Sequence, residues 1–288
     1  MKYLYYPGCS LEGTSVEYNI STKVLLEALD VQLEEIDDWN CCGATAAEAQ
    51  SNLLSYVLPA RNLALSEKMN TSKEILVPCS ACYLNLKKTE IAIKKDKALL
   101  RTINTALAEN DLALQGDVTV RHLLDVLSND IDIETIQKTA QDKMSGLVIA
   151  PYYGCQCLRP FAVFDDPEDP HSMDALIRAT GAKPLEWDMG GQCCGASNTS
   201  TKPEAGMALV GKILKSAKGA DAILTVCPMC QMNLESHQKK ISQIQGINLE
   251  IPVLFLPQFL GLAMGKKPGE VRLDLNLSNT KALTKKPV

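Results

Sequence analysis

Cys41-Cys42-Gly43-Ala44 is repeated later in the chain as Cys193-Cys194-Gly195-Ala196. In each half a lone Gly-Cys precedes this stretch and a C-x-x-C segment follows it. The five cysteines of the first half are Cys9, Cys41, Cys42, Cys79 and Cys82, and those of the second half are Cys155, Cys193, Cys194, Cys227 and Cys230. Equivalent cysteines keep their order and lie about 150 positions apart, which indicates internal duplication and two like domains.

The repeat extends beyond cysteine. Cys79-x-x-Cys82-x-x-Asn85-Leu86 aligns with Cys227-x-x-Cys230-x-x-Asn233-Leu234, and Tyr6-Pro7-Gly8-Cys9 aligns loosely with Tyr152-Tyr153-Gly154-Cys155. One of the 11 cysteines, Cys157, falls outside the pattern. It is either an unliganded core cysteine or a replacement for Cys155, and Gly154, which precedes Cys155 as Gly8 precedes Cys9, favours Cys155 as the repeated residue.

The composition is that of a globular protein and excludes several classes. The chain has 288 residues, of which 46% are hydrophobic, and this is enough to bury a sizeable core. Its net charge of −5, with both signs interspersed, argues against a nucleic-acid binder. The apolar stretch at 251–264 is interrupted by prolines and is too short to span a bilayer. With no secretory signal apparent, we expect a soluble cytoplasmic protein, in which so many cysteines indicate metal or redox chemistry.

The hydrophobic patterns predict alternating strands and helices, hence an α/β fold. Strands are predicted at 2–6, 31–36, 74–77, 147–150, 183–187 and 222–226. Helices are predicted at 14–29, 45–69 with a break or kink at Pro59, from 80 onward, and at 96–109, 120–127, 134–141, 172–180 and 203–218. This places the repeated cysteines at strand ends and helix starts, the edge of an α/β sheet where sites form.

The same patterns predict four segments. We expect a first domain at 1–95, a helical linker or insert at 96–145, a second domain at 146–265 and a C-terminal tail at 266–288. Each domain is predicted to be a small sheet with flanking helices.

The cysteine spacing favours an iron–sulfur site and leaves zinc and dithiol redox chemistry open. A C-x-x-C segment alone serves all three. Zinc takes four ligands, whereas each half offers five. Two adjacent cysteines do not easily close on one tetrahedral ion, but they can bind two irons of one cluster. A regular 4Fe–4S cubane also needs only four thiolates. Either one cysteine per half is a spectator or the cluster is irregular.

These motifs resemble the cysteine-rich CCG domains, and in particular the B subunit of heterodisulfide reductase. The resemblance covers residues 1–265 and includes Tyr5-Tyr6-Pro7-Gly8-Cys9-Ser10-Leu11-Glu12-Gly13 and Tyr153-Gly154-Cys155 followed by Arg159-Pro160. It implies one noncubane 4Fe–4S cluster per half. The ligands would be Cys9, Cys41, Cys42, Cys79 and Cys82 for one cluster, and Cys155, Cys193, Cys194, Cys227 and Cys230 for the other.

The resemblance also implies an activity: reduction of the coenzyme M–coenzyme B heterodisulfide, or an analogous disulfide, with one half of the substrate captured at each cluster. The family is typical of methanogenesis, and relatives occur in other hosts. The chain lacks a ferredoxin-type cysteine run and a G-x-G-x-x-G helix start, so its electrons must come from another protein. In the family the donors are a small ferredoxin-like protein, the C subunit, and a flavin-containing protein, the A subunit.

Other residues carry weaker signals. Arg159, close to Cys155, is a candidate for binding an anionic group of the substrate. Trp39 and Trp187 precede the CCG turns and either shield the clusters or pack as core. The stretch at 251–264 is either a core strand and helix or a docking surface. The tail after Lys266 is expected to lie extended against a neighbour.

Two further functions stay open. CCG domains also occur in electron-transfer subunits of lactate- and glycolate-oxidising complexes and of quinone-linked complexes, where they are not catalytic. A zinc-stabilised scaffold is the third hypothesis, which metal analysis separates from the other two.

Overall fold

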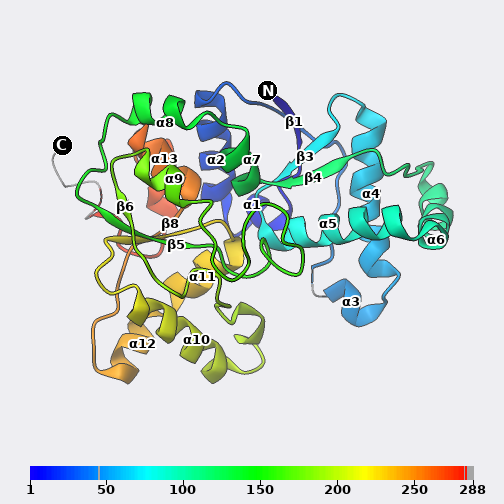
Figure 1. Ribbon diagram of the computed structural model, residues 1–288. Coiled ribbons are helices and arrows are strands. Elements are labelled where there is room, and N and C mark those ends of the chain that lie inside the picture. Colours follow the sequence, from blue (N-terminus) through cyan, green and yellow to red (C-terminus); the bar gives the residue numbers. More distant parts are fainter. Residues whose placement is uncertain (45, 282, 284–288) are drawn as a thin grey trace.

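The computed structural model describes residues 1–44, 46–281 and 283, and its core is two four-stranded parallel sheets (Figure 1). The first sheet contains β1 (Lys2–Tyr5), β2 (Gln32–Glu35), β3 (Glu74–Val77) and β4 (Thr119–His122), in the order β2-β1-β3-β4. The second contains β5 (Val148–Tyr152), β6 (Lys183–Pro184), β7 (Ala222–Thr225) and β8 (Val253–Phe255), in the order β6-β5-β7-β8. The identical order confirms the predicted duplication and the α/β class.

Helices flank both sheets. Those of the first half are α1 (Cys9–Glu12), α2 (Val16–Ala28), α3 (Ala46–Gln50), α4 (Leu54–Met69), α5 (Ser80–Lys95), α6 (Lys97–Leu107), η1 (Ala108–Asn110), α7 (Leu123–Asn129) and α8 (Ile133–Ala140). Those of the second half are α9 (Asp174–Arg178), η2 (Ala196–Asn198), α10 (Pro203–Ser216), α11 (Pro228–Ser236), α12 (Gln238–Gln245), α13 (Leu256–Ala263) and η3 (Leu273–Leu275).

The central strands are buried on both faces. Leu4 and Tyr5 of β1 and Ile75 and Leu76 of β3 are all inaccessible to solvent. A parallel strand covered by helices on both sides needs apolar residues at every position, rather than at alternate ones. This is why the short runs Tyr-Leu-Tyr and Ile-Leu-Val were recognisable as strands from the sequence.

The fourth strand of the first sheet corrects the sequence prediction. A helix was predicted at 120–127, but β4 occupies Thr119–His122 and helix α7 begins only at Leu123. The β4 strand pairs in parallel with β3, with Val77 opposite His122. Residues 96–145, predicted to be a linker or insert, therefore complete the first sheet. The four residues of β4 run directly into a leucine-rich helix, so the local pattern showed only the helical period.

The helix break after the CCG turn also differs from the prediction. It lies between α3 and α4, at 51–53, whereas Pro59 lies inside α4. Pro59 stands in the second turn of α4, so the ring removes one internal hydrogen bond near the helix start without ending the helix. Residue 45, the predicted first residue of this helical region, lies outside the described residues.

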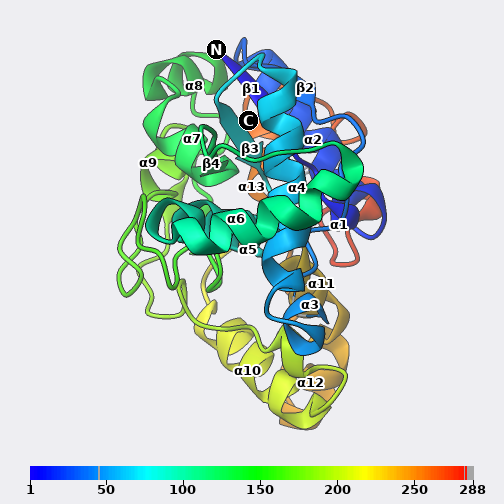
Figure 2. The same cartoon turned by 90° about the vertical axis from the view of Figure 1, so that its right-hand side faces the viewer.

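The two halves pack into one unit through two equivalent helix pairs. Helix α2 of the first half packs on α13 of the second, and α9 of the second half packs on α7 of the first (Figures 1 and 2). Since α7 follows β4 as α13 follows β8, the pairs are related by the pseudo-two-fold. A single cluster of buried side chains contains residues of both sheets. The two cysteine sets are thus held on one packed framework.

The C-terminal segments pack on the chain itself. Residues 251–264 form β8 and the buried helix α13, which confirms the core strand and helix and removes the docking-surface alternative. Beyond Lys266, Val271 is buried, and the Ser278 hydroxyl donates to the Glu235 carboxylate at 2.5 Å. The tail, expected to lie extended against a neighbour, instead packs on its own chain, and the Ser278 bond ties it to α11. Residues 282 and 284–288 lie outside the described part of the chain.

Candidate functional site

Each cysteine set begins where the two central strands of a sheet end. Cys9 follows β1 and Cys79 follows β3, and these neighbouring strands connect to opposite sides of the sheet. The gap between such strands is the position at which open α/β sheets bind ligands. Cys155 and Cys227 occupy the same positions after β5 and β7. The fold therefore creates one equivalent site per half.

The first site gathers the five cysteines predicted for it. The Sγ atoms of Cys9 and Cys41 are 3.7 Å apart, and those of Cys42 and Cys82 are 3.5 Å apart. The Cys79 thiol interacts with that of Cys82. Cys9 and Cys41 are exposed, whereas the other three are buried, so the site extends from the core to the surface.

The second site repeats this arrangement. The Sγ atoms of Cys194 and Cys230 are 3.6 Å apart, and the Cys227 thiol interacts with that of Cys230. Cys155 pairs with Cys193, and Cys193 is exposed. Cys155, which the preceding glycine favours, thus lies with the other four cysteines.

The remaining cysteine lies outside both sites. Cys157 is buried, and its thiol donates to the backbone carbonyl of Tyr153 at 3.2 Å. Burial raises the pKa of Cys157, which keeps it a neutral thiol of the core.

The glycine before the first cysteine makes room for a later one. Gly8 has φ 74° and ψ 162°, and a Cβ on it would lie 2.6 Å from Cys82 Sγ. Gly154 has φ 69°, and its Cβ would lie 2.9 Å from Cys230 Sγ. At both sites the backbone approaches the last thiol too closely for any side chain.

Two tyrosines that the sequence analysis did not single out hold the CCG turns. The Tyr6 hydroxyl donates to the Asn40 carbonyl at 2.8 Å, and the Tyr152 hydroxyl donates to the Gln192 carbonyl at 2.7 Å. Each accepting residue directly precedes an adjacent cysteine pair. The signal was present in the sequence, because the alignment of Tyr6-x-Gly-Cys with Tyr152-x-Gly-Cys places both tyrosines at the same position.

The two tryptophans pack against these tyrosines. Trp39 meets the Tyr6 ring edge-on at 5.3 Å between centroids, and Trp187 meets the Tyr152 ring at 6.3 Å. Both are therefore part of the aromatic packing that supports the CCG turns.

The repeated asparagines also reach the cysteine pairs. Asn85 Nδ2 donates to Cys42 Sγ at 3.7 Å, whereas Asn233 Nδ2 donates to the Cys194 carbonyl at 2.7 Å. The asparagine of C-x-x-C-x-x-N thus links the helix that carries the last cysteines to the CCG turn. The sequence pointed to this asparagine through its repetition at the same position in both halves.

The second thiol of each adjacent pair is the acidic one. Hydrogen bonds from Cys41, Cys82 and Asn85 hold the pKa of Cys42 well below its ordinary value. Contacts with Cys230, with the Ala196 amide and with Asn233 lower the pKa of Cys194 to about 6. A contact with Cys230 also lowers the pKa of Cys227 in the second site. The thiolate is the form that binds metal, so each site holds at least one sulfur that ionises readily.

The backbone also favours negative charge at both sites. The Gly43 amide donates to Cys41 Sγ at 3.4 Å, and the Gly195 amide donates to Cys193 Sγ at 3.3 Å. Cys79 and Cys227 occupy the N-cap positions of α5 and α11, where the helix dipole stabilises an anion.

These donor sets fit a group held by several thiolates. Within residues 1–44, 46–281 and 283, no three His, Cys, Asp or Glu side chains are arranged to hold a metal ion as they stand. Several of the thiols pair through S–H···S contacts, and ligation would require their deprotonation. Each set supplies five sulfurs, at least one of them with a lowered pKa, and backbone amides are directed at the first sulfur of the adjacent pair.

Arg159 takes part in the packing of its own loop. Its Nη1 donates to the Gly191 carbonyl at 2.7 Å, and its Nη2 contacts the Pro167 carbonyl and the Glu168 carboxylate. The guanidinium predicted to bind a substrate anion thus bridges two loops of the second half.

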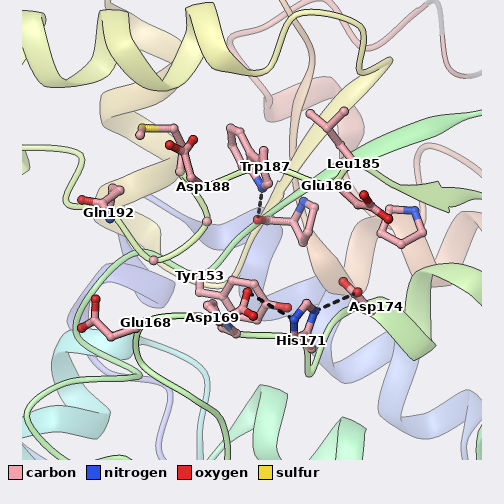
Figure 3. Close-up of a pocket in the computed structure, with 16 residues that line it drawn as sticks. Tyr153, Glu168, Asp169, His171, Asp174, Leu185, Glu186, Trp187, Asp188 and Gln192 are labelled. Atoms are coloured by element: carbon pink, nitrogen blue, oxygen red, sulfur yellow. Dashed lines mark hydrogen bonds and ion pairs between the residues drawn. The ribbon is translucent and has the colours of Figure 1, made fainter.

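An acidic cavity lies beside the second site. It has a volume of about 660 Å³, contains no cysteine, and is bounded by Trp187, Gln192 and the 168–174 segment (Figure 3). His171 lies between Asp169 and Asp174, at 3.2 and 3.1 Å, and these contacts raise its pKa. The carboxylates of the cavity disfavour an anionic ligand there.

The comparisons with known proteins agree with this geometry. The family model described as "CCG: Cysteine-rich domain" matches residues 3–87 and 149–235. The chain is 32% identical over 280 residues to the 8-methylmenaquinol:fumarate reductase membrane anchor subunit of Wolinella succinogenes, covering 96% of each chain. It is 28% identical over 288 residues to the B subunit of the ferredoxin/F420H2-dependent CoB-CoM heterodisulfide reductase of Methanosarcina acetivorans, covering 97% of this chain and 95% of that one.

Two further similarities cover most of the chain. A protein of Archaeoglobus profundus, described as like the heterodisulfide reductase B subunit, is 28% identical over 94% of this chain and 93% of its own. A hypothetical protein from Helicobacter pylori shares the fold, with a TM-score of 0.71 and 17% identity, and this chain spans 51% of its length. None of the helices in the described part of the chain combines the length and the hydrophobicity that a membrane span requires. With both halves matched by one family model, and with full-length similarity to heterodisulfide reductase B subunits, the chain belongs to the cysteine-rich CCG domain family, as its sequence predicted.

Proposed function

We propose that this chain is the disulfide-reducing subunit of a heterodisulfide reductase-type complex. The single observation that carries the proposal is the presence of two complete and equivalent five-thiol sites on one framework, each with an exposed edge. Cleaving a disulfide takes two electrons. Two sites in one chain match that requirement, whereas an electron-relay subunit needs no such symmetry.

The two sites would hold two noncubane 4Fe–4S clusters. The ligands would be Cys9, Cys41, Cys42, Cys79 and Cys82 in the first half, and Cys155, Cys193, Cys194, Cys227 and Cys230 in the second. When bound, such clusters supply single electrons at a metal that accepts thiolates. The exposed Cys9, Cys41 and Cys193 would lie on the side of each cluster that a substrate can reach. The buried cysteines would hold the opposite side of each cluster in the protein core, away from water.

The substrate in this proposal is the coenzyme M–coenzyme B heterodisulfide or an analogous disulfide. The electrons would come from partner subunits, since relatives of this chain are named as subunits of larger reductases. A ferredoxin-like iron–sulfur protein (the C subunit) and a flavin-containing protein (the A subunit) are the donors that this proposal names.

The test is metal and activity analysis of protein purified without oxygen. Wild-type chain is expected to hold about eight iron atoms and little zinc. Cys42→Ser and Cys194→Ser are each expected to hold about half of that iron and to lose disulfide reduction. Cys157→Ser, which changes a core thiol outside both sites, is the matched control and keeps its iron. Zinc in place of iron, or full activity in either single-site variant, contradicts the proposal.

A second candidate function is electron transfer in a quinol-linked reductase. The observation that favours it is the 32% identity, over 96% of the chain, to a protein named as the membrane anchor of an 8-methylmenaquinol:fumarate reductase. The purified complex distinguishes the two functions. Quinol-dependent reduction without any disulfide reduction supports the second candidate, and disulfide reduction with reduced ferredoxin supports the first.

A further inference from the structure

A buried tyrosine ties the two cysteine sites together. The Tyr18 hydroxyl, on α2, lies 3.0 Å from the Pro78 carbonyl oxygen and 3.2 Å from the Val226 carbonyl oxygen, and shares its one proton between these two acceptors. Pro78 directly precedes Cys79 in the first site, and Val226 directly precedes Cys227 in the second. One hydroxyl therefore holds the equivalent carbonyls of both halves.

A serine makes a second and more direct link. The Ser80 hydroxyl donates to the same Val226 carbonyl at 3.1 Å and lies 3.3 Å from His122 Nε2. Ser80 is the residue after Cys79. A single hydrogen bond therefore joins the backbone segment Cys79–Ser80 of one site to Val226–Cys227 of the other.

The surroundings keep these contacts fixed. Tyr18 is inaccessible to solvent, Ser80 is 1% exposed, and Tyr18 stacks on Phe255 with 4.0 Å between ring centroids and 1° between planes. Phe255 ends β8, the strand next to β7, which leads to Cys227. Hydrogen bonds in such an apolar interior are costly to break, because no water replaces them.

We propose that Tyr18 and Ser80 are positioning residues that fix the separation of the two cysteine sites, and that the Cys79–Ser80···Val226–Cys227 link carries single-electron exchange between them. The inference rests on the proposed function, since it requires a redox group at each site. In this exchange one site is oxidised by one electron and the other is reduced by one, and no atom or proton moves. The benefit is that both electrons reach a disulfide held between the sites before a half-reduced product escapes.

The experiment compares three variants of the full chain. Tyr18→Phe removes the hydroxyl but keeps the ring on Phe255, and Ser80→Ala removes the direct link. Tyr5→Phe is the matched control, because Tyr5 is equally buried and, among the described residues, its hydroxyl donates to Asn19 of the same half at 2.9 Å and to neither carbonyl of the link. Each protein is loaded anaerobically, its iron is counted, and it is freeze-quenched for EPR after one and after two reducing equivalents. Cys42→Ser and Cys194→Ser supply the reference spectra of single sites.

The expected result distinguishes a positioning role for Tyr18 and Ser80 from an effect on the stability of the fold alone. In wild type and Tyr5→Phe, the two reduced sites show a spin–spin interaction, and the first electron equilibrates between them. In Tyr18→Phe and Ser80→Ala with full iron, the interaction weakens and the equilibration slows. Misplacing the sites is expected to lower kcat about tenfold, with KM unchanged.

Three outcomes overturn the inference. Full-iron variants with wild-type spin interaction and kcat refute it and leave the proposed function standing. The same loss in Tyr5→Phe shows a general packing effect and refutes it as well. If the wild type holds no iron, the proposed function fails and the inference fails with it.

Discussion

Gly8→Ala is expected to damage the first cysteine site through one contact. Gly8 has φ 74° and ψ 162°, a region that is essentially restricted to glycine, and a side chain there costs about 1–3 kcal/mol. The added Cβ would lie 2.6 Å from Cys82 Sγ. Because Cys82 is only 3% exposed, its thiol has little room to move, and overpacking adds about 1–3 kcal/mol. Together, the loss in free energy of unfolding is about 2–6 kcal/mol.

The matched control isolates the contact from the backbone strain. Gly146 has φ 78°, and a Cβ added to it would meet nothing within 4 Å, so Gly146→Ala carries only the backbone cost of about 1–2 kcal/mol. Guanidinium unfolding of both variants without metal gives the two free energies. Iron analysis of the loaded proteins then shows whether Gly8→Ala loses iron from the first site alone.

The refuting result is a Gly8→Ala protein that unfolds like Gly146→Ala and holds the full complement of iron. It would mean that the thiol of Cys82 moves aside without cost, and that the close approach at the first site does not constrain the cysteines.

Three single contacts give further predictions. Tyr6→Phe removes the buried hydroxyl that donates to the Asn40 carbonyl. We expect the free energy of unfolding to fall by about 1–3 kcal/mol, measured as a lower midpoint of guanidinium unfolding. An unchanged midpoint would show that this bond does not hold the CCG turn. Burial raises the pKa of the Glu235 carboxyl, so the folded state binds the carboxyl proton more tightly than the unfolded state does. The stability that this proton contributes is lost as pH rises through the raised pKa. Glu235→Gln should therefore flatten the dependence of unfolding free energy on pH in that window, and curves parallel to those of the wild type would contradict the prediction. Arg159→Gln should speed hydrogen exchange in the loop that contains Glu168 and leave the KM for the disulfide unchanged. A tenfold rise in KM, equivalent to about 1.4 kcal/mol, would instead support the substrate-binding role expected from the sequence.

Much of the candidate site was predictable because its signals are local and repeated. The cysteines, their glycines and the strand runs lie within short segments, and each segment occurs twice. A glycine before Cys9 and before Cys155 already indicated which of Cys155 and Cys157 belongs to the set, and the pairing of Cys155 with Cys193 agrees. The tyrosines and asparagines of the two motifs were also visible in the alignment, but their hydrogen bonds were not.

The sequence by itself determined the duplication, the α/β class and the order of ten cysteines around strand ends and helix starts, because strand burial and tight turns leave a pattern within a few residues. Only the tertiary structure decided what joins the two sites. Tyr18, Pro78 and Val226 are far apart in the chain, and they meet because α2 of one half packs on α13 of the other. The strand β4 and the loop contacts of Arg159 were decided in the same way. Such contacts depend on packing between distant segments, and no local period or motif encodes them. The repeated Cys-Cys-Gly explains why there are two sites, and the fold explains why they are held together.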